Sequence, residues 1–130
     1  MVSLSCTVSS AVSPPAVEIT SLPGDSNYFA GLELNLTCRA TISLIQSLTP
    51  TVTIVWRING VPIVNGDGIM VEETVLISEG IYERTLHFQP LKISHEGIYT
   101  CSADVSVSNE EFTDSATSEV LQEEIAIESE

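Results

Sequence analysis

Residues 32–40, with the sequence LELNLTCRA, decide the fold class. Every second residue in this stretch is apolar and the residues between them are mostly polar, which is the pattern of a strand with one buried and one solvated face. Residues 52–58, VTIVWRI, repeat the alternation. The dipeptide Asn59-Gly60 follows, and it tolerates positive φ and closes hairpins.

Further strand-like runs follow at short intervals, separated by turn signals rich in glycine, asparagine or glutamate. These runs cover residues 61–64, 69–77, 81–88 and 97–107, with a last strand within 112–121. No window has helical periodicity over three turns. Many short strands separated by turns predict an all-β fold, a two-sheet antiparallel sandwich.

The composition narrows the class of protein. The chain has 130 residues and 14.0 kDa, the size of one domain, and its mean hydropathy of +0.26 is too high for a disordered chain. Eighteen acidic residues against four basic ones give a formal charge of −14. Nucleic-acid binding and binding to anionic membranes are excluded, because both need a cationic face. No apolar run approaches the roughly 18 residues of a membrane-spanning helix.

Four residues have a spacing that names a family. Cys38 and Cys101 lie 63 residues apart (101 − 38), each on the apolar face of its predicted strand. Trp56 lies between them and also points inward, and Tyr99 precedes Cys101 by two residues. This Cys…Trp…Tyr-x-Cys constellation resembles the immunoglobulin superfamily.

The resemblance implies Greek-key connections and a disulfide between Cys38 and Cys101 that joins the two sheets, with Trp56 packed on it. A bridge that closes a loop of 63 residues stabilises a fold by about 4 kcal/mol in the chain-entropy model. The hydroxyl of Tyr99 is expected to bond backbone at the corner before its strand. The expected core residues are Trp56, Tyr99, Leu36, Leu86, Phe88 and Leu91.

Two features depart from the family pattern. The corner often has an acidic residue four positions before the tyrosine, paired with an arginine, but His95 stands there and no arginine lies near Ile69. We therefore expect this ion pair to be absent. The long segment between Cys38 and Trp56 predicts an enlarged loop over residues 43–50. The spacing from Trp56 onward favours an intermediate or V-like set of strands.

The predicted domain covers residues 14–121, between an N-terminal extension (residues 1–13) and an acidic, solvated C-terminal tail (residues 122–130). The extension has neither the positive start nor the apolar segment of a secretory signal, so the chain is either cytosolic or a piece of an exported protein. Around Cys6 it reads LSCTV, so it is either the end of an upstream immunoglobulin-like domain or a terminus with a free thiol.

The cell compartment is inferred from the disulfide. A sandwich that depends on a buried disulfide belongs outside the cytosol, which predicts an extracellular or cell-surface location. Asn35-Leu36-Thr37 is an acceptor sequence for N-glycosylation on the polar side of its strand, and it is either occupied or a chance match.

No catalytic residue, metal site or cofactor is expected. His87 and His95 have no second ligand at metal spacing, and acidic pairs such as Glu72-Glu73 lack the spacing of a calcium loop. Neither a nucleophile elbow nor a phosphate-binding loop is present. The sequence thus predicts a protein that is not an enzyme.

Protein recognition is the expected activity. Val55 is an apolar residue on an outward face that also carries Arg57 and Asp104, two residues that we expect to pair across the sheet. The loops at residues 43–50 and 107–112 are a second candidate surface. The partner is a protein ligand or another immunoglobulin-like domain, bound homophilically or heterophilically, and the acidic chain favours a basic partner. Membrane attachment would come only from parts outside this sequence.

We therefore expect an extracellular immunoglobulin-like module for protein recognition or cell adhesion within a larger, multi-domain receptor ectodomain. One alternative is a passive spacer domain. Another is an accessory carbohydrate-binding sandwich, which needs exposed aromatic rings. The candidates for those rings are Tyr28, Phe29, Tyr82 and Phe112.

Overall fold

The computed structural model describes residues 13–22, 28–43, 49–108, 113–121 and 125–128. These residues form short strands and a single turn of 3-10 helix, η1. In chain order the elements are β1 (Ala16–Leu22), β2 (Tyr28–Phe29), β3 (Leu34–Thr41), β4 (Thr51–Ile58), β5 (Val61–Pro62), β6 (Ile69–Val71), β7 (Val75–Ser78), β8 (Ile81–Phe88), η1 (Ile93–His95), β9 (Tyr99–Ser108), β10 (Thr113–Leu121) and β11 (Ile127–Glu128).

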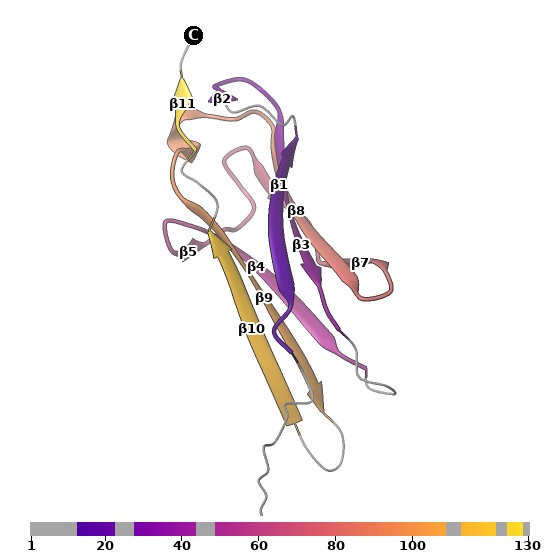
Figure 1. The fold of residues 1–130 in the computed structure, drawn as a ribbon. Helices are drawn as coiled ribbons and strands as arrows, with labels where there is room; N and C mark the ends of the chain where they lie inside the picture. Colours follow the sequence, from indigo (N-terminus) through magenta and orange to yellow (C-terminus); the bar gives the residue numbers. More distant parts are fainter. Residues whose placement is uncertain (1–12, 23–27, 44–48, 109–112, 122–124, 129–130) are drawn as a thin grey trace, which may run out of the picture.

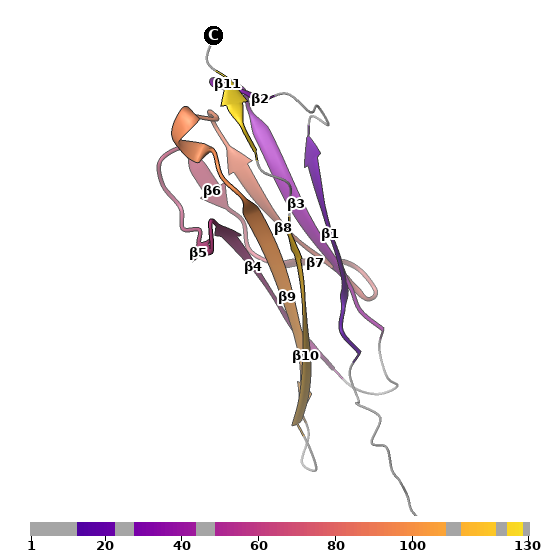
Figure 2. The same ribbon diagram turned by 60° about the vertical axis from the view of Figure 1, so that its left-hand side comes forward.

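Two antiparallel sheets form the sandwich (Figures 1 and 2). The first sheet has the order β1-β3-β8-β6, with β7 also pairing with β8, and the second has the order β10-β9-β4-β5. The chain crosses from the first sheet to the second after β3, returns after β5, and crosses again after β8. The predicted all-β, two-sheet sandwich is confirmed. Residues 69–77, read as one strand, form two strands, β6 and β7, separated by residues 72–74.

The period-two pattern decides which side chains are buried. Along β3 the buried residues alternate with half-buried ones, and the pairing with β8 sets Leu36 opposite Leu86. The main core contains Leu34, Leu36, Cys38, Ala40, Ile54, Trp56, Leu86, Phe88, Leu91, Tyr99, Cys101, Ala103, Ile125 and Ile127. A smaller core consists of Ile42, Val105 and Val107.

The prediction of a solvated tail after Leu121 is wrong for Ile125 and Ile127. Ile125 and Ile127 are only 1% and 6% exposed, and both belong to the main core. Ile125 exchanges two backbone hydrogen bonds with Gly97, and β11 pairs in parallel with β2. The physical reason is the spacing of the two isoleucines, which puts both on one face of an extended chain although the surrounding residues are acidic.

The described chain enters and leaves the sandwich at opposite ends (Figure 1). β1 begins where β3 ends, since Ala16 pairs with Thr41, whereas β11 lies beside β2 at the other end. Within the described residues, no helix is long and apolar enough to cross a membrane.

Candidate recognition surfaces

The centre of the molecule is a disulfide between Cys38 of β3 and Cys101 of β9, whose Cα atoms lie 6.3 Å apart. Trp56 pairs directly with Cys101 across the second sheet and is 1% exposed. Its indole nitrogen Nε1 donates a hydrogen bond of 2.9 Å to the carbonyl of Arg84 on the opposite sheet. The disulfide and the indole thus join the two sheets at neighbouring positions, because Trp56 pairs with Cys101 and Arg84 pairs with Cys38.

The corner between β8 and β9 is closed by Tyr99. Its hydroxyl donates a hydrogen bond to the carbonyl of His95, four residues upstream. Burial raises the pKa of Tyr99, so the phenol stays protonated and available as a donor. The Phe88 ring packs edge-on against Tyr99, with ring centroids 5.8 Å apart. This is the tyrosine corner that the resemblance implied.

His95 stands four residues before Tyr99, where the family often has an acidic residue, and it is 2% exposed. Its Nδ1 accepts the backbone N–H of Lys92 at 3.0 Å, and its Nε2 lies 2.8 Å from the carbonyl oxygen of Asp67. These partners fit a neutral ring with its proton on Nε2. Lys92 Nζ lies 2.9 Å from Asp67 Oδ1, and this contact holds the pKa of Asp67 below its ordinary value. The sequence alone did not indicate the contact between His95 and Asp67, because Asp67 stands in a turn 28 residues away.

The outward side of the second sheet, here called the hydroxyl face, carries mostly serine and threonine. Its register positions on β4, β9 and β10 are Thr51, Thr53, Val55, Arg57, Thr100, Ser102, Asp104, Ser106, Ser108, Thr113, Ser115, Thr117, Glu119 and Leu121. Among them Thr100 is buried and Leu121 is 68% exposed. Val55 is half-buried and lies between Thr53 and Arg57 along β4, opposite Ser102.

The predicted pair between Arg57 and Asp104 does not form. The register of β4 and β9 sets Arg57 opposite Thr100, and Asp104 opposite Thr53, so the two charges are separated by four residue positions along the strands. Arg57 Nη1 donates to Ser102 Oγ at 3.0 Å, and Thr117 donates to Asp104 at 2.6 Å. Alternation predicted the shared face, but only the register decides which residues are opposite one another.

The outward side of the first sheet, here called the ion-pair face, carries longer polar side chains that satisfy one another. Arg39 Nη2 lies 2.6 Å from Glu83 Oε2, and the hydroxyls of Thr37 and Thr85 lie 3.0 Å apart. Each of these pairs joins directly opposite residues of β3 and β8.

The glycosylation candidate Asn35 lies on the ion-pair face. Its side-chain oxygen is 2.7 Å from Nδ1 of His87, the residue opposite on β8, and Nε2 of His87 contacts the carboxylate of Glu72. These contacts tie the segment after β6 to the middle of the first sheet.

Arg84 has a role that the sequence did not reveal. It stands opposite Cys38, at an inward register position, and its guanidinium donates to the carbonyls of Glu72 at 2.6 Å and Ile54 at 2.7 Å. Arg84 therefore links β8 to β4 and to the segment after β6. It does so beyond the two residues of β4 that pair with β5. An arginine in phase with the inward residues Leu86 and Phe88 was the available signal.

Several predicted features lie wholly or partly outside the described residues: Cys6, Phe112 and most of the loops at 43–50 and 107–112. Tyr28 and Tyr82 are half-buried and pack against the core, and Phe29 is half-buried as well. In the part of the chain that the structure describes, no group of three or more His, Cys, Asp or Glu residues could hold a metal ion.

The described geometry is that of a two-sheet antiparallel sandwich with a disulfide across its centre, a packed tryptophan and a tyrosine corner. A family model for the immunoglobulin domain matches residues 14–104, which is more than half of the chain. The chain therefore belongs to the immunoglobulin domain family. No curated protein matches it.

Proposed function

We propose that this immunoglobulin domain is an extracellular module for protein recognition or cell adhesion within a larger, multi-domain receptor ectodomain. Immunoglobulin domains commonly mediate recognition or adhesion, and a disulfide at the core suits an oxidising compartment. Entry and exit at opposite ends of the sandwich suit a domain joined to others in a row.

The hydroxyl face is the proposed binding surface, and its composition is the observation that carries the proposal. Serine and threonine lose little side-chain entropy when a partner covers them. They also form few ion pairs that would have to be desolvated. A partner bound on the ion-pair face would bury the Arg39–Glu83 pair. The cost of desolvating two charges can exceed the attraction between them.

The proposed partner is a different protein with a basic surface. Two copies of a chain with a charge of −14 repel each other, which disfavours homophilic contact at low salt. A basic partner would be attracted over a long range, and its association rate would fall as salt is added.

The test is a binding screen with two matched variants. The secreted chain is displayed as a tetramer and screened against an array of secreted ectodomains that includes the chain itself. Val55→Lys adds a positive charge to the hydroxyl face, which would repel a basic partner, and Thr20→Lys adds the same charge to an exposed position on β1 of the ion-pair face.

We expect Val55→Lys to weaken binding about tenfold or more, in the range of a central interface residue, and Thr20→Lys to leave it unchanged. Equal loss in both variants would reject the hydroxyl face. The absence of binding to any ectodomain would favour the passive spacer.

Glycosylation at Asn35 is part of the same proposal, because a glycan on the ion-pair face would leave the hydroxyl face open. The contact between the Asn35 side-chain oxygen and His87 turns the amide so that its nitrogen is directed away from the ring. Secretion from a eukaryotic cell followed by enzymatic removal of N-glycans should shift the mass, and Asn35→Gln should abolish the shift. An unmodified secreted chain would reject the site.

The carbohydrate-binding alternative has little support. Sugar stacking needs an exposed aromatic ring, whereas the three candidate rings in the described residues are half-buried. Two hollows in the described part, of about 260 Å³ and 190 Å³, are smaller than ordinary ligand sites, and among the described residues that line them none is phenylalanine, tyrosine or tryptophan.

A further inference from the structure

The outer edge of the first sheet is protected along β6 but bare along β7. Asn65 accepts the backbone N–H of Val71 through its side chain at 2.6 Å, and Gly66 exchanges two backbone hydrogen bonds with Ile69. β7 pairs with β8 on one side only. Among the described residues, no hydrogen bond reaches the other side of β7. Its backbone groups are therefore free to pair with another strand.

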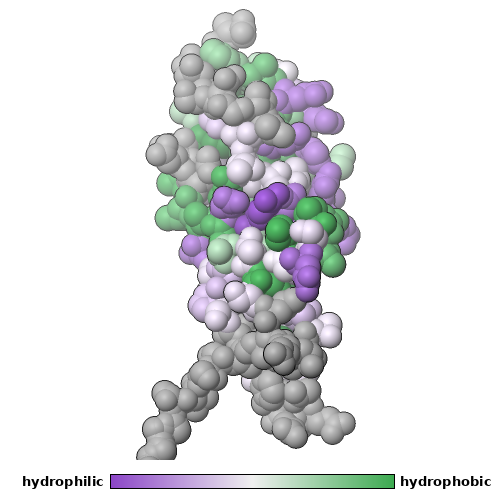
Figure 3. Space-filling view, turned by 45° about the vertical axis from the view of Figure 1, so that its right-hand side comes forward, coloured by the Kyte–Doolittle hydropathy of each residue, from purple (hydrophilic) through white to green (hydrophobic). Residues whose placement is uncertain are grey.

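The side chains of β7 are apolar and exposed. Val75, Leu76 and Ile77 are 46%, 60% and 49% exposed. Because they are consecutive, they present apolar surface on both faces of the edge. Figure 3, which brings the side with β7 forward, shows hydrophobic surface directly beside hydrophilic surface. Natural edge strands usually carry lysine or proline against unwanted pairing, and β7 has neither.

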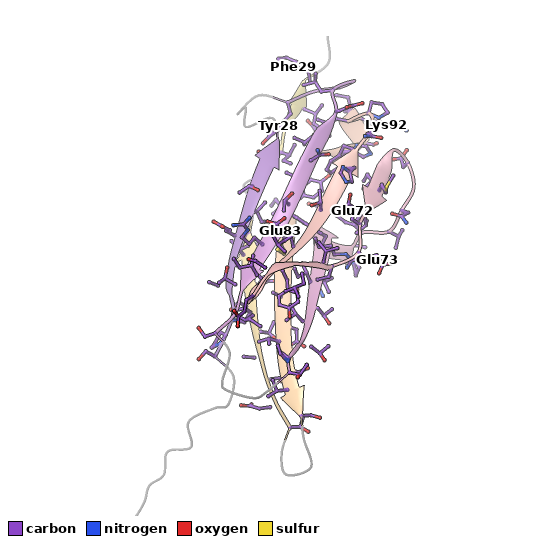
Figure 4. The ribbon with its side chains drawn as sticks, turned by 90° about the vertical axis from the view of Figure 1, so that its right-hand side faces the viewer. Tyr28, Phe29, Glu72, Glu73, Glu83 and Lys92 are labelled. Atoms are coloured by element: carbon purple, nitrogen blue, oxygen red, sulfur yellow. A yellow bond between two sulfur atoms is a disulfide. The ribbon has the colours of Figure 1, made fainter. Side chains whose placement is uncertain are left out.

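Carboxylates flank this edge at both ends. Glu72 and Glu73 lie on the stretch that leads into β7, and Figure 4 shows them beside the edge together with Glu83 of β8. Glu79 follows β7 directly. Glu83 pairs with Arg39, and Glu72 contacts His87, but no ion pair reaches Glu73 or Glu79 from the described residues. Two exposed negative charges thus bracket an apolar strand edge.

We propose that β7 is a docking edge for an extended segment of a partner protein in which basic and apolar residues alternate. The segment adds to the first sheet as a further strand, with backbone hydrogen bonds to β7 and apolar side chains against Val75, Leu76 and Ile77. Its lysines or arginines reach Glu73 and Glu79. A second copy of this chain is a poorer occupant, because pairing two such edges would bring like charges together.

This edge is separate from the hydroxyl face. β7 belongs to the first sheet and the hydroxyl face to the second, so either surface can fail its test without affecting the other.

The probe is a capped peptide of alternating lysine and valine, about six residues long to match an ordinary strand. A peptide of alternating glutamate and valine is the control. Binding is titrated at low salt by amide chemical shifts of the labelled chain. We expect the lysine peptide to shift the amides of β7 and its flanking residues, and the glutamate peptide to leave them in place.

Matched charge variants separate local from general attraction. Glu73→Lys/Glu79→Lys and Glu18→Lys/Glu33→Lys change the net charge equally, and Glu18 and Glu33 are exposed positions on β1 and directly before β3. We expect the first variant to weaken binding about tenfold, from two attractions lost and two repulsions gained, and the second by no more than about threefold.

Leu76→Gln, at an exposed position where the fold tolerates a polar residue, should also weaken binding and serves as a test of the apolar contact. Equal weakening by both charge variants would overturn the proposal, as would equal binding of the two peptides. A concentration-dependent dimer in sedimentation equilibrium that Leu76→Gln dissolves would overturn it in favour of a second copy.

Discussion

The two ends of the sandwich are held together in different ways. At the corner end, formed by η1, β2 and β11, side chains bond directly to backbone groups: Tyr99 to His95, His95 to Asp67, and Glu96 to Ile127 at 2.7 Å. At the loop end, where β9 ends and β10 begins, the described residues are held by strand pairing and the small core of Ile42, Val105 and Val107.

The difference indicates that the two ends have different local stability. Segments with few buried apolar contacts open more easily than those fixed by a large core and a buried polar network. The predicted loops at residues 43–50 and 107–112 begin at the loop end.

The largest effect is expected from removing the bond that serves both ends. Cys38→Ala/Cys101→Ala releases a loop of 63 residues and should lower the free energy of unfolding by about 4 kcal/mol. Denaturant titration measures the loss. Amide hydrogen exchange should show protection falling at both ends alike, because the bridge lies between them. A loss confined to one end would contradict this.

Ile125→Ala should produce the largest effect specific to the corner end. Removing most of a side chain that is 1% exposed leaves a cavity under the corner, and such changes cost about 2–5 kcal/mol. Thermal unfolding followed by calorimetry measures it. Ala126→Ser, on the exposed residue between the two isoleucines, is the control and should be nearly neutral. A neutral Ile125→Ala would mean that the chain after Leu121 does not contribute to the core.

The burial of the segment around Ile125 could not be predicted from the sequence. Strong alternation, as in β3, was sufficient for the strands and for the buried side of each, because the pattern repeats over many residues. In the segment around Ile125 it covers two residues among acids, too few to separate a core strand from a tail. Only the structure reveals that Gly97 offers its backbone to Ile125.

The candidate site was less predictable than the fold. The outward positions of Val55, Arg57 and Asp104 follow from alternation, but the partners of Arg57 and Asp104 depend on the register of β4 and β9. The bond between His95 and Asp67 joins residues 28 apart, and nothing local links a turn to a corner.

Tyr99→Phe tests the polar part of the corner end. The change keeps the ring against Phe88 but leaves the buried carbonyl of His95 without this donor, which costs about 1–3 kcal/mol. Exchange protection should fall around η1 and β11 and stay unchanged at Val105 and Val107. A uniform fall at both ends would mean that the corner is not a separate local unit.

Val107→Ala tests the loop end from the other side. Two methyl-sized groups are lost from a core of three residues at the surface end of the sheet, which can relax around them, so about 1–2 kcal/mol is expected. The loss should be smaller than that of Ile125→Ala, because the core at the loop end is smaller. If chemical denaturation gave equal losses for the two variants, the two ends would be equally well packed.

The smallest effect is expected at Asp67, on the solvent side of the corner. Lys92 lowers the pKa of Asp67 below its ordinary value of 3.8 in the folded chain, so the carboxylate stabilises the fold above that pH. The contribution is lost as the pH falls through the lowered value. Asp67→Asn should therefore be slightly destabilising at pH 7 and neutral at strongly acidic pH. Asparagine keeps the positive φ of 55° at this position accessible, so backbone strain does not enter.

A double-mutant cycle with Lys92→Met isolates the pair, because it subtracts what each side chain does on its own. The coupling between Asp67 and Lys92 should be present at neutral pH, weaken with added salt, and vanish in acid. Coupling that persisted below the pKa of the carboxyl group would assign the effect to packing of the lysine stem. The corner end would then owe its stiffness to its buried bonds alone, and the ion pair on its surface would be incidental.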